Sequence, residues 1–382
     1  MTFRRYLCSR IDWNDRLICI KGPKGTGKTT LILQHIRETF GTGGNKAIYV
    51  ALDHIWFATH DALEAIEYFH SHGFTHLFLD EVHHFPNWAS LIKTISDFYP
   101  DLFVVYSGSS LLKLSESRAD LSRRQAVYSL KGLSFREFLS FEQGIEVPVL
   151  PLEDVLSDHR SLAEGIVSSV KILPLFAQYL ASGYYPFYRS VSSQFKDRLA
   201  EVVNTVLDVD FPAVEDVTPS TIRKAKKMLV ILAKSCPQQP NMSALYRELG
   251  TDRNLGLKIL DALQRAELLL LLESGAAKLK RMSKPEKIFP GDTNLMHALV
   301  PAPDVGALRE TFFANQLRAG GHDVLAPDKG DFLVDGKFLF EIGGSQKGFS
   351  QVKDIPDSYI ASDGIELGFG NKIPLWLFGC LY

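Results

Sequence analysis

Cysteine is scarce in this sequence. Only four cysteines occur among 382 residues, and no two of them stand at a paired spacing. They are Cys8, Cys19, Cys236 and Cys380. Disulfide frameworks and zinc knuckles need cysteines at short, regular spacings, so the pattern argues against both. A reducing cytoplasm fits this cysteine usage best.

The sequence also lacks an excess of charge and a long apolar run. Its formal net charge is −2, so no general basic excess predicts a nucleic-acid partner, although local patches still can. No stretch approaches the length of a membrane span, and residues 1–5 are followed by too little apolar sequence for a signal peptide. We therefore expect a cytoplasmic protein without a membrane partner.

Length and composition indicate several globular domains. With 382 residues, 46% of them hydrophobic, the chain can form two or three cores. Residues 147–151 (VPVLP) predict a linker. We expect a first domain at 1–146, a helical domain at 147–300 and a small C-terminal domain at 301–382.

The clearest motif is a glycine-rich loop, GPKGTGKT at residues 22–29, which fits the pattern GxxxxGK(S/T). Residues 17–20 before it predict a buried strand, and residues 30–36 after it predict a helix. Such a loop points backbone N–H groups and a helix N-terminus at phosphates. We expect Lys28 to reach the β- and γ-phosphates and Thr29 to bind Mg²⁺. The predicted nucleotide-binding residues are Gly22, Pro23, Lys24, Gly25, Thr26, Gly27, Lys28, Thr29 and Thr30.

Two adjacent acids, Asp80 and Glu81, follow an apolar strand predicted at 75–79. We expect Asp80 to hold Mg²⁺, directly or through water, and Glu81 to act as the general base on the attacking water. An acidic pair after a strand is by itself a common turn. Its distance after the glycine loop favours the catalytic interpretation.

Further strands alternate with helical segments, which predicts an α/β fold with a mostly parallel sheet. The predicted strands are 17–20, 46–52, 75–79, 102–106 and 126–130, with a helix at 59–72. Ser107 follows the fourth strand and is our candidate for sensing the γ-phosphate or holding the water. Arg118, Arg123 or Arg124 could neutralise charge in the transition state, although solvated surface arginines are an equally good interpretation.

Four segments together resemble prokaryotic AAA-type ATPases related to the archaeal ATPase family. They are EVHHFPNW at 81–88, SGSS at 107–110, LSRR at 121–124 and LSFREFL at 133–139. Ser107 replaces the threonine typical of that family and Arg123 replaces a glycine, while Arg124 matches the family arginine. The resemblance implies a P-loop NTPase fold that binds ATP or ADP with Mg²⁺. The sequence also has no guanine-reading Asn-Lys-x-Asp motif.

Seven of the eleven histidines lie between residues 54 and 84. They are His54, His60, His70, His72, His76, His83 and His84. They are spread over a predicted helix, strand and loop without a recognisable zinc-ligand spacing. We therefore expect Mg²⁺ bound with the nucleotide rather than zinc.

The middle of the chain is predicted to be helical. The segment 180–186 (LASGYYP) resembles the Gly-Gly-Tyr-Pro segment of the same family, and we expect it to contact the nucleotide-binding domain. From residue 220 the order of elements is that of a winged helix. Those elements are helices at 222–234, 242–249 and 254–266, a strand at 268–272, a basic turn at 278–281 and a strand at 287–289.

Residues 219–290 contain fourteen lysines and arginines against six acids. This local excess makes duplex DNA a candidate partner, and packing against the ATPase is the alternative. The candidate phosphate contacts are Arg253, Lys258, Lys278, Lys280 and Arg281.

The last part of the chain resembles the PD-(D/E)xK nuclease fold. A helix at 305–317 carries Glu310, a strand hairpin spans 331–341, and 373–381 is a last apolar strand. Asp331 and Glu341 match the metal-binding acids, but Gly343 stands where the motif lysine belongs. Lys347 can replace that lysine only if its loop folds back. Binding or packing is therefore favoured over cleavage.

The whole sequence predicts a Mg²⁺-dependent ATPase whose nucleotide state repositions the later domains. One alternative is a DNA-binding regulatory or defence protein that uses ATP as a switch. The other is a phosphotransferase, which would need an arginine-rich lid that the sequence does not show. A protein partner or a homo-oligomer is compatible with all three.

Overall fold

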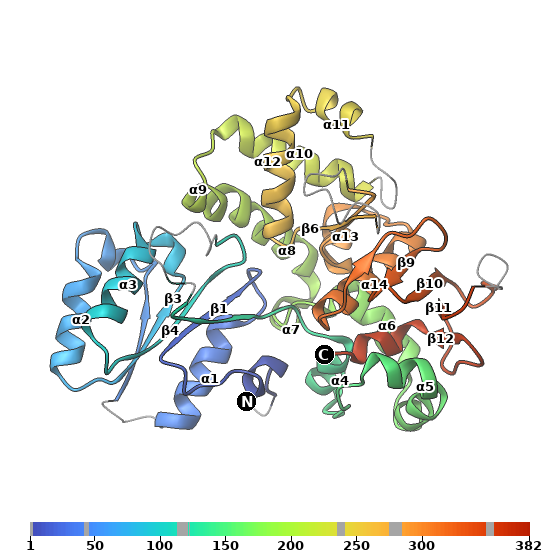
Figure 1. Cartoon of the computed structure of the whole chain (residues 1–382), viewed down its shortest axis with the longest axis horizontal. Coiled ribbons are helices and arrows are strands. Elements are labelled where there is room, and N and C mark those ends of the chain that lie inside the picture. The colour runs from blue at the N-terminus through green and yellow to red at the C-terminus, as the bar shows by residue number, and fades with distance from the viewer. Residues whose placement is uncertain are drawn as a thin grey trace. The chain divides into compact units, whose positions relative to one another are not determined.

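The structure is a computed structural model that describes residues 3–41, 46–112, 121, 123–234, 241–274, 285–348 and 355–382. The chain forms two compact units (Figure 1). The first contains residues 1–131 and 205–218, and the second contains residues 132–204 and 219–382. Among the described residues no single helix is long and apolar enough to cross a membrane, and one pair of helices bent by 94° passes that test only together.

The first unit is built on a five-stranded parallel sheet with the order β2-β3-β4-β1-β5. Its strands are β1 (Leu17–Gly22), β2 (Ala47–Ala51), β3 (His76–Asp80), β4 (Phe103–Ser109) and β5 (Ala126–Ser129). Its helices and helical turns are η1 (Tyr6–Ser9), α1 (Lys28–Phe40), η2 (Ile55–Ala58), α2 (Ala62–Ser71), η3 (Val82–His84), α3 (Trp88–Phe98), η6 (Val206–Asp210) and α9 (Phe211–Val214). This confirms the predicted α/β fold with helices beside a parallel sheet.

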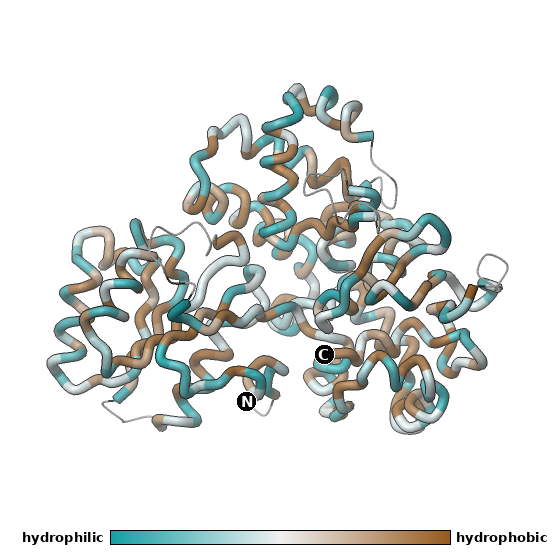
Figure 2. The backbone as a smooth tube through the Cα atoms, viewed as in Figure 1, coloured by the Kyte–Doolittle hydropathy of each residue, from teal (hydrophilic) through white to brown (hydrophobic). Residues whose placement is uncertain are grey.

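Alternation along the strands gives the sheet two apolar faces, and its strands are predominantly apolar (Figure 2). One face packs against α2 and α3. Its buried residues include Leu17, Cys19, Leu77, Leu79, Val104 and Tyr106 from the strands and Ile66, Ile92 and Ile95 from the helices. On the other face, the Phe78 ring lies 6.0 Å from that of His35 and 6.3 Å from that of Phe40 in α1.

The predicted helix at 59–72 begins later, at Ala62. The cause is Asp61, whose side chain accepts hydrogen bonds from the backbone N–H groups of Leu63 and Glu64. An aspartate that satisfies the free N–H groups of a first turn fixes the start of a helix.

The second unit contains a mixed five-stranded sheet with the order β12-β11-β10-β9-β8 and a two-stranded antiparallel sheet, β6-β7. Its strands are β6 (Leu269–Leu272), β7 (Lys287–Pro290), β8 (Val324–Leu325), β9 (Phe332–Val334), β10 (Phe338–Gly343), β11 (Ser358–Ser362) and β12 (Lys372–Pro374). Its longer helices are α4 (Phe135–Gln143), α5 (Leu152–Val167), α6 (Ile172–Gln178), α8 (Phe195–Thr205), α10 (Pro219–Lys234), α11 (Met242–Glu248), α12 (Arg253–Arg265), α13 (Thr293–Leu299) and α14 (Val305–Ala319). Shorter helical turns are η4 (Tyr179–Gly183), α7 (Tyr188–Val191), η5 (Ser192–Gln194) and η8 (Leu375–Cys380).

The compact units divide the chain differently from the expected boundaries at 146 and 300. Helix α4 belongs to the second unit, where the Phe135 ring packs against Phe176 and Trp376. A boundary at 300 does not appear either, because Lys287 of β7 pairs with Glu310 of α14. The segment 147–151 packs into the second unit, with Val147 and Leu150 buried.

One further expectation for the second unit needs correction, while segment 180–186 contacts Leu133 of the expected first domain, whose N–H donates to the Tyr184 carbonyl (2.7 Å). Residues 373–381 form the short strand β12 followed by η8, not one strand, because a fully buried apolar run does not distinguish strand from helix. The segment 180–186 bonds to α13 within the same unit. The Tyr184 N–H donates to the Asn294 side chain (2.8 Å) and the Tyr185 hydroxyl to Asp292 (2.8 Å).

Asp292, the N-cap of α13, generates a prediction about pH. Burial raises the pKa of Asp292 to about 7 from an ordinary value of 3.8. At pH values between 3.8 and about 7, Asp292 therefore keeps its proton in the folded state and has lost it in the unfolded state. The free energy of unfolding should fall by up to roughly 1.4 kcal/mol per pH unit as pH rises through this window.

The matched variant is Asp292→Asn, which cannot ionise. Its amide oxygen can still accept from the Leu295 N–H, and its NH2 group, in place of Oδ2, can donate to the oxygen of the Tyr185 hydroxyl. Denaturant titrations from pH 4.5 to 8 should show that the free energy of unfolding of the variant increases relative to that of the wild type as pH rises. Parallel pH profiles for the two proteins would contradict a buried, titrating Asp292.

Gly22 generates a second prediction, because a Cβ added there would lie 2.2 Å from the Leu130 carbonyl oxygen. Gly22→Ala should lower the free energy of unfolding by about 1–3 kcal/mol. Gly165→Ala is the control, since nothing lies within 4 Å of its added Cβ in α5 and alanine favours a helix by about 0.5–1 kcal/mol. Urea denaturation measures both, and an unchanged midpoint for Gly22→Ala would show that the strand end can move aside.

Candidate functional site

The glycine-rich loop joins β1 to α1, and two of its glycines are required by the backbone. Gly25 has φ 85° and Gly27, the N-cap of α1, has φ 95°. Residues with a Cβ avoid this left-handed region, so the chain can turn into the helix here only through glycine. The buried Thr26 hydroxyl donates to the Pro23 carbonyl (2.9 Å) and braces the turn. The two glycines and this hydrogen bond therefore fix the shape of the loop.

Lys28 is buried beneath this loop. Its ammonium donates to the carbonyl oxygens of Gly22 (2.9 Å) and Pro23 (3.1 Å). Burial lowers the pKa of Lys28, and the negative charges of Glu81 and Asp80 act in the opposite direction. The predicted lysine therefore lies inside the loop with both predicted acids in its electrostatic environment.

Asp80 is the centre of a hydrogen-bonded group at the carboxyl edge of the sheet. One oxygen, Oδ2, accepts from the hydroxyls of Thr29 (2.6 Å) and Tyr49 (2.6 Å). The other, Oδ1, accepts from the Ser107 hydroxyl and from the Glu81 N–H (3.2 Å). The strand register explains the meeting, since β3 lies between β2 and β4 and all run in parallel.

These residues fit a magnesium ion. Mg²⁺ prefers oxygen ligands and is commonly held by one or two protein groups, with water and phosphate completing its shell. The Thr29 hydroxyl and the Asp80 carboxylate are already in contact, as a shared ion requires. Tyr49 is a contact that the sequence did not predict, because it lies within β2 outside any motif. Burial and the hydrogen bond to Asp80 raise the pKa of Tyr49.

Glu81 has an unusual backbone conformation, with φ 54° and ψ 42°. A non-glycine residue in this region is strained by roughly 1–2 kcal/mol, so neighbouring bonds must hold it. Its N–H group lies within hydrogen-bond distance of the Ser107 hydroxyl (3.3 Å) as well as of Asp80. The turn separates the two adjacent carboxylates. That of Asp80 is buried, while the Glu81 side chain keeps 21% exposure, which a base acting on water needs.

Arg5 supports the loop from the start of the chain, and sequence reasoning missed it. Its buried guanidinium donates to the Thr26 carbonyl and to the Lys131 carbonyl (2.7 Å). An isolated arginine before the first strand has no sequence signal that marks this role.

Arg124 lies elsewhere in the structure as described. It forms an ion pair with Asp97 of α3 and does not join Thr29, Asp80 and Glu81. Arg118 lies outside the described residues. Thr30 is exposed at the start of α1. The roles assigned to Arg124, Ser107 and Thr30 stay predictions.

Most of the seven histidines between residues 54 and 84 lie apart from one another. His76 stacks on Phe103 at 4.8 Å, and His70 pairs with Asp101 at 2.8 Å. Among the described residues, Glu81, His83 and His84 have ligand atoms within 4.8 Å of one another, close enough to hold a metal ion. The spacing argument did not foresee this convergence.

The two clustered histidines also meet Asp210, which comes from the segment 205–218. Its Oδ1 lies 3.6 Å from His83 Nε2, 3.5 Å from His84 Nε2 and 3.4 Å from the Lys24 ammonium. Burial alone would raise the pKa of Asp210, but its interactions with His83, Lys24 and His84 bring that pKa below its usual value. A segment with no recognisable motif thus reaches the predicted nucleotide site.

In the second unit, α10, α11, α12, β6 and β7 follow in the order expected of a winged helix. Arg253 and Lys258 are exposed on α12. The other three candidate phosphate contacts, Lys278, Lys280 and Arg281, lie outside the described residues. DNA binding by this region stays a prediction.

The nuclease-like acids are held by lysines. Lys347 Nζ lies 2.6 Å from Glu341 Oε2, and a Cβ on Gly343 would lie 2.7 Å from the Lys347 side chain, so the loop does fold back over the glycine. Lys287 pairs with Glu310 at 3.1 Å and lies 3.7 Å from Asp331. Within the described residues these acids do not converge as a metal-binding group. The nuclease-like assignment stays a prediction.

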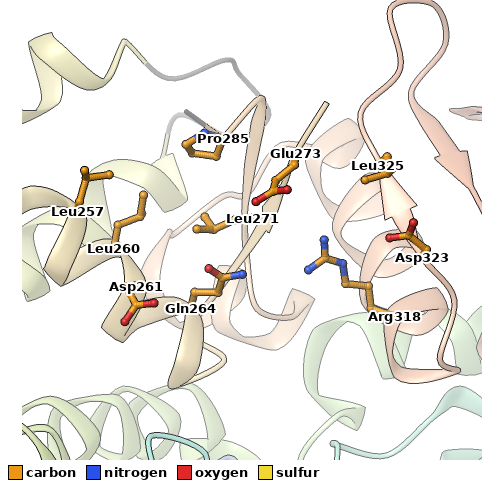
Figure 3. A pocket seen from close by; sticks show the side chains of 10 residues that line it. All are labelled: Leu257, Leu260, Asp261, Gln264, Leu271, Glu273, Pro285, Arg318, Asp323 and Leu325. Atoms are coloured by element: carbon orange, nitrogen blue, oxygen red, sulfur yellow. The ribbon is translucent and has the colours of Figure 1, made fainter. Parts of the chain in front are cut away.

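A pocket of about 360 Å³ lies within the second unit, lined from α12, β6 and α14 (Figure 3). Arg318 lies between Glu273 and Asp323 there. Burial lowers the pKa of Arg318, and the two carboxylates oppose that shift. Because Glu273 and Pro285 flank residues outside the described part, we assign the pocket no ligand.

Two family models match separate parts of the chain. Residues 14–139 match the family model of an AAA domain, and residues 173–305 match a domain of unknown function (DUF8612). An uncharacterized protein of Methanocaldococcus jannaschii is 26% identical over 392 residues, which cover 94% of this chain and 82% of the relative.

Three solved structures show weaker similarity. PCH-2 of C. elegans is 19% identical with a TM-score of 0.24, covering 35% of this chain and 39% of that one. The Pif1 helicase of Candida albicans is 13% identical with a TM-score of 0.26, covering 43% of this chain and 47% of that one. The S. cerevisiae Hsp104-ADP complex is 15% identical with a TM-score of 0.26, covering 65% of this chain and 36% of that one. The chain spans less than half of each. Together with the loop, the acid pair and the parallel sheet, the family match identifies residues 14–139 as an AAA-type P-loop domain.

Proposed function

We propose that the protein is a Mg²⁺-dependent ATPase. The observation that carries this proposal is the convergence of Lys28, Thr29, Asp80 and Glu81 at one edge of the parallel sheet. They are the residue types that phosphate binding, metal binding and water activation need. The preference for ATP follows from the resemblance stated above.

The loop supplies the phosphate site. Its backbone N–H groups and the N-terminus of α1 favour negative charge. Lys28 exchanges its two loop carbonyls for phosphate oxygens when a nucleotide binds. Thr29 and Asp80 hold the Mg²⁺, which neutralises charge on the phosphates when bound. Thr29 and Asp80 are already in contact, so the reorganisation that precedes catalysis falls mainly on Lys28.

Glu81 takes the proton from the attacking water. Its carboxylate faces His83 (3.4 Å) and stays partly exposed, so Asp80 can bind the metal while Glu81 remains available as a base. Ser107 bonds to Asp80 and lies within reach of the Glu81 N–H, which fixes the relation between the two acids. Arg124 is 39% exposed and is available to neutralise phosphate charge after release from Asp97.

The nucleotide state acts on the second unit through the chain itself. The segment 205–218 belongs to the first unit, but the chain before and after it belongs to the second. Movement of this segment on ATP binding or hydrolysis is therefore passed to α8 and α10. Repositioning of the second unit follows from that continuity.

This function predicts different effects for two substitutions. Lys28→Ala should abolish nucleotide binding, because the phosphates lose their buried cation. Glu81→Gln should bind nucleotide normally and lose roughly 10²–10⁴-fold in turnover, because an amide cannot accept the proton. Titration with a fluorescent ATP analogue measures binding, and phosphate release measures turnover.

Glu64→Gln is the matched control, since Glu64 is exposed in α2 and has no contact with the site. It should hydrolyse ATP at the wild-type rate. A wild-type rate in Glu81→Gln would show that another group is the base, and a wild type that binds ATP without releasing phosphate would refute the ATPase.

A DNA-binding protein that uses ATP as a switch is the second candidate, and the exposure of Arg253 and Lys258 on α12 favours it. Duplex DNA should bind with an affinity that falls as salt rises, because each neutralised phosphate releases counterions. Changing Lys258→Glu should weaken binding by roughly tenfold at low salt, whereas Arg160→Glu in α5 should not. Fluorescence anisotropy of labelled duplex DNA, with and without ATP, measures this binding. No binding at low salt in either condition would refute the DNA-binding function.

A further inference from the structure

A buried carboxylate reaches the nucleotide site from a remote part of the chain. Asp210 is 1% exposed and ends the π-helical turn η6. Pro212 follows two residues later, and its missing N–H interrupts the regular helical ladder at this point. The sequence thus provides a local reason for the irregular turn that directs Asp210 inward.

His83 stands between this carboxylate and the predicted base. Its Nε2 faces Asp210 Oδ1 at 3.6 Å, and its Nδ1 faces Glu81 Oε2 at 3.4 Å. The side chain has no exposed area, so the ring cannot turn to water for its hydrogen bonds. Among the described residues Nε2 has no partner at hydrogen-bond distance, and Asp210 Oδ1, at 3.6 Å, lies only just beyond that distance. Closing that gap is favourable, because unsatisfied buried groups cost free energy.

We propose that Asp210 and His83 are positioning residues that hold the Glu81 carboxylate in the geometry needed to activate water. The proposal rests on the proposed ATPase function. Neither residue touches the reacting atoms. Asp210 orients the ring of His83, and the ring orients Glu81.

Asp210 acts by keeping a proton on Nε2. A neutral ring then offers Nδ1 as an acceptor to the Ser109 N–H (3.3 Å), and a charged ring donates from Nδ1 to Glu81. The hydrogen bond to Glu81 therefore needs the charged ring. In the neutral ring, whose Nδ1 is an acceptor like Glu81 Oε2, only the fixed ring plane limits where the Glu81 side chain lies. Without Asp210 the ring can exchange its tautomer or flip, and a displacement of about 1 Å at a catalytic group can cost 10²-fold in rate.

The same carboxylate contacts the phosphate-binding loop. Lys24 lies 3.4 Å from Asp210 Oδ1, the oxygen that also faces His83 and His84. Asp210 therefore responds to both the loop and the base. Since the chain on either side of 205–218 belongs to the second unit, that unit is joined directly to the segment that carries Asp210.

A metal ion is the competing interpretation of this cluster, because Glu81, His83 and His84 can share one. Two observations favour the hydrogen-bonded array. The Lys24 ammonium already supplies a positive charge at Asp210, and the Ser109 amide occupies Nδ1 of His83. A cation at Nδ1 would displace the Ser109 amide, and a cation at Nε2 would add positive charge beside the Lys24 ammonium.

Steady-state kinetics on matched variants tests the proposal. His83→Leu and Asp210→Asn should each lower kcat roughly 10- to 100-fold while KM for ATP changes less than about threefold. His83→Gln should recover part of kcat, because its amide can still donate to Asp210. In a Glu81→Gln background, His83→Leu should cause no further loss, since there is no base left to position.

The exposed pair His70–Asp101 is the control, as it has the same chemistry in the same unit. His70→Leu and Asp101→Asn should leave kcat unchanged. Wild-type kcat in both His83→Leu and Asp210→Asn, with Glu81→Gln still inactive, would overturn the positioning role and leave the ATPase standing. An equal loss for His83→Leu in the Glu81→Gln background would overturn it as well.

Ring NMR gives a readout that does not depend on turnover. In ¹⁵N-histidine spectra, the His83 signals are those that disappear in His83→Gln. They should shift in the Asp210→Asn variant and stay unchanged in the Asp101→Asn variant. Unshifted signals would overturn the proposal even if the protein does not hydrolyse ATP. Calorimetric binding of one Zn²⁺ that His83→Gln abolishes would also overturn it, because a metal-bound Nε2 cannot donate to Asp210.

Discussion

The hydrogen bonding of the Asp80 carboxylate is the interaction on which the nucleotide site depends. A carboxylate buried to 2% exposure is costly unless each oxygen is satisfied. Here the partners come from the loop helix, through Thr29, and from the two strands beside β3, through Tyr49 and Ser107. The Asp80 side chain thereby links β2, β3, β4 and the start of α1 by hydrogen bonds at one edge of the sheet. Any rearrangement of these elements must break a bond to a buried charge.

Parallel pairing produces this concentration of chemistry. All five strands of the first sheet end at the same edge, so residues distant in sequence meet there without long loops. The loop after β1 supplies Lys28, and the turn after β3 supplies Glu81. The strained backbone of Glu81 then gives two neighbouring acids different surroundings. Two roles therefore follow from one dipeptide.

The division of the chain carries a consequence for regulation. Segment 205–218 is part of the nucleotide-binding unit although its neighbours in sequence are not. It places Asp210 among Lys24, His83 and His84, where a carboxylate is stabilised by three basic groups. In the proposed function, this returning segment is the link between the site and the rest of the chain. The linear order of domains would not suggest this arrangement.

Local patterns in the sequence determined the loop, the acid pair, the parallel sheet and most element bounds, because these depend on short-range periodicity and on glycine backbone freedom. Lys28, Thr29 and Asp80 could be named from spacing alone. Only the tertiary structure decided what a carboxylate or an imidazole meets across the fold. Tyr49 has no motif, and Asp210 lies 186 positions after Lys24, so nothing in the linear sequence links either residue to the site. Their contacts arise from strand order and chain return, which are set by the packing of the whole unit.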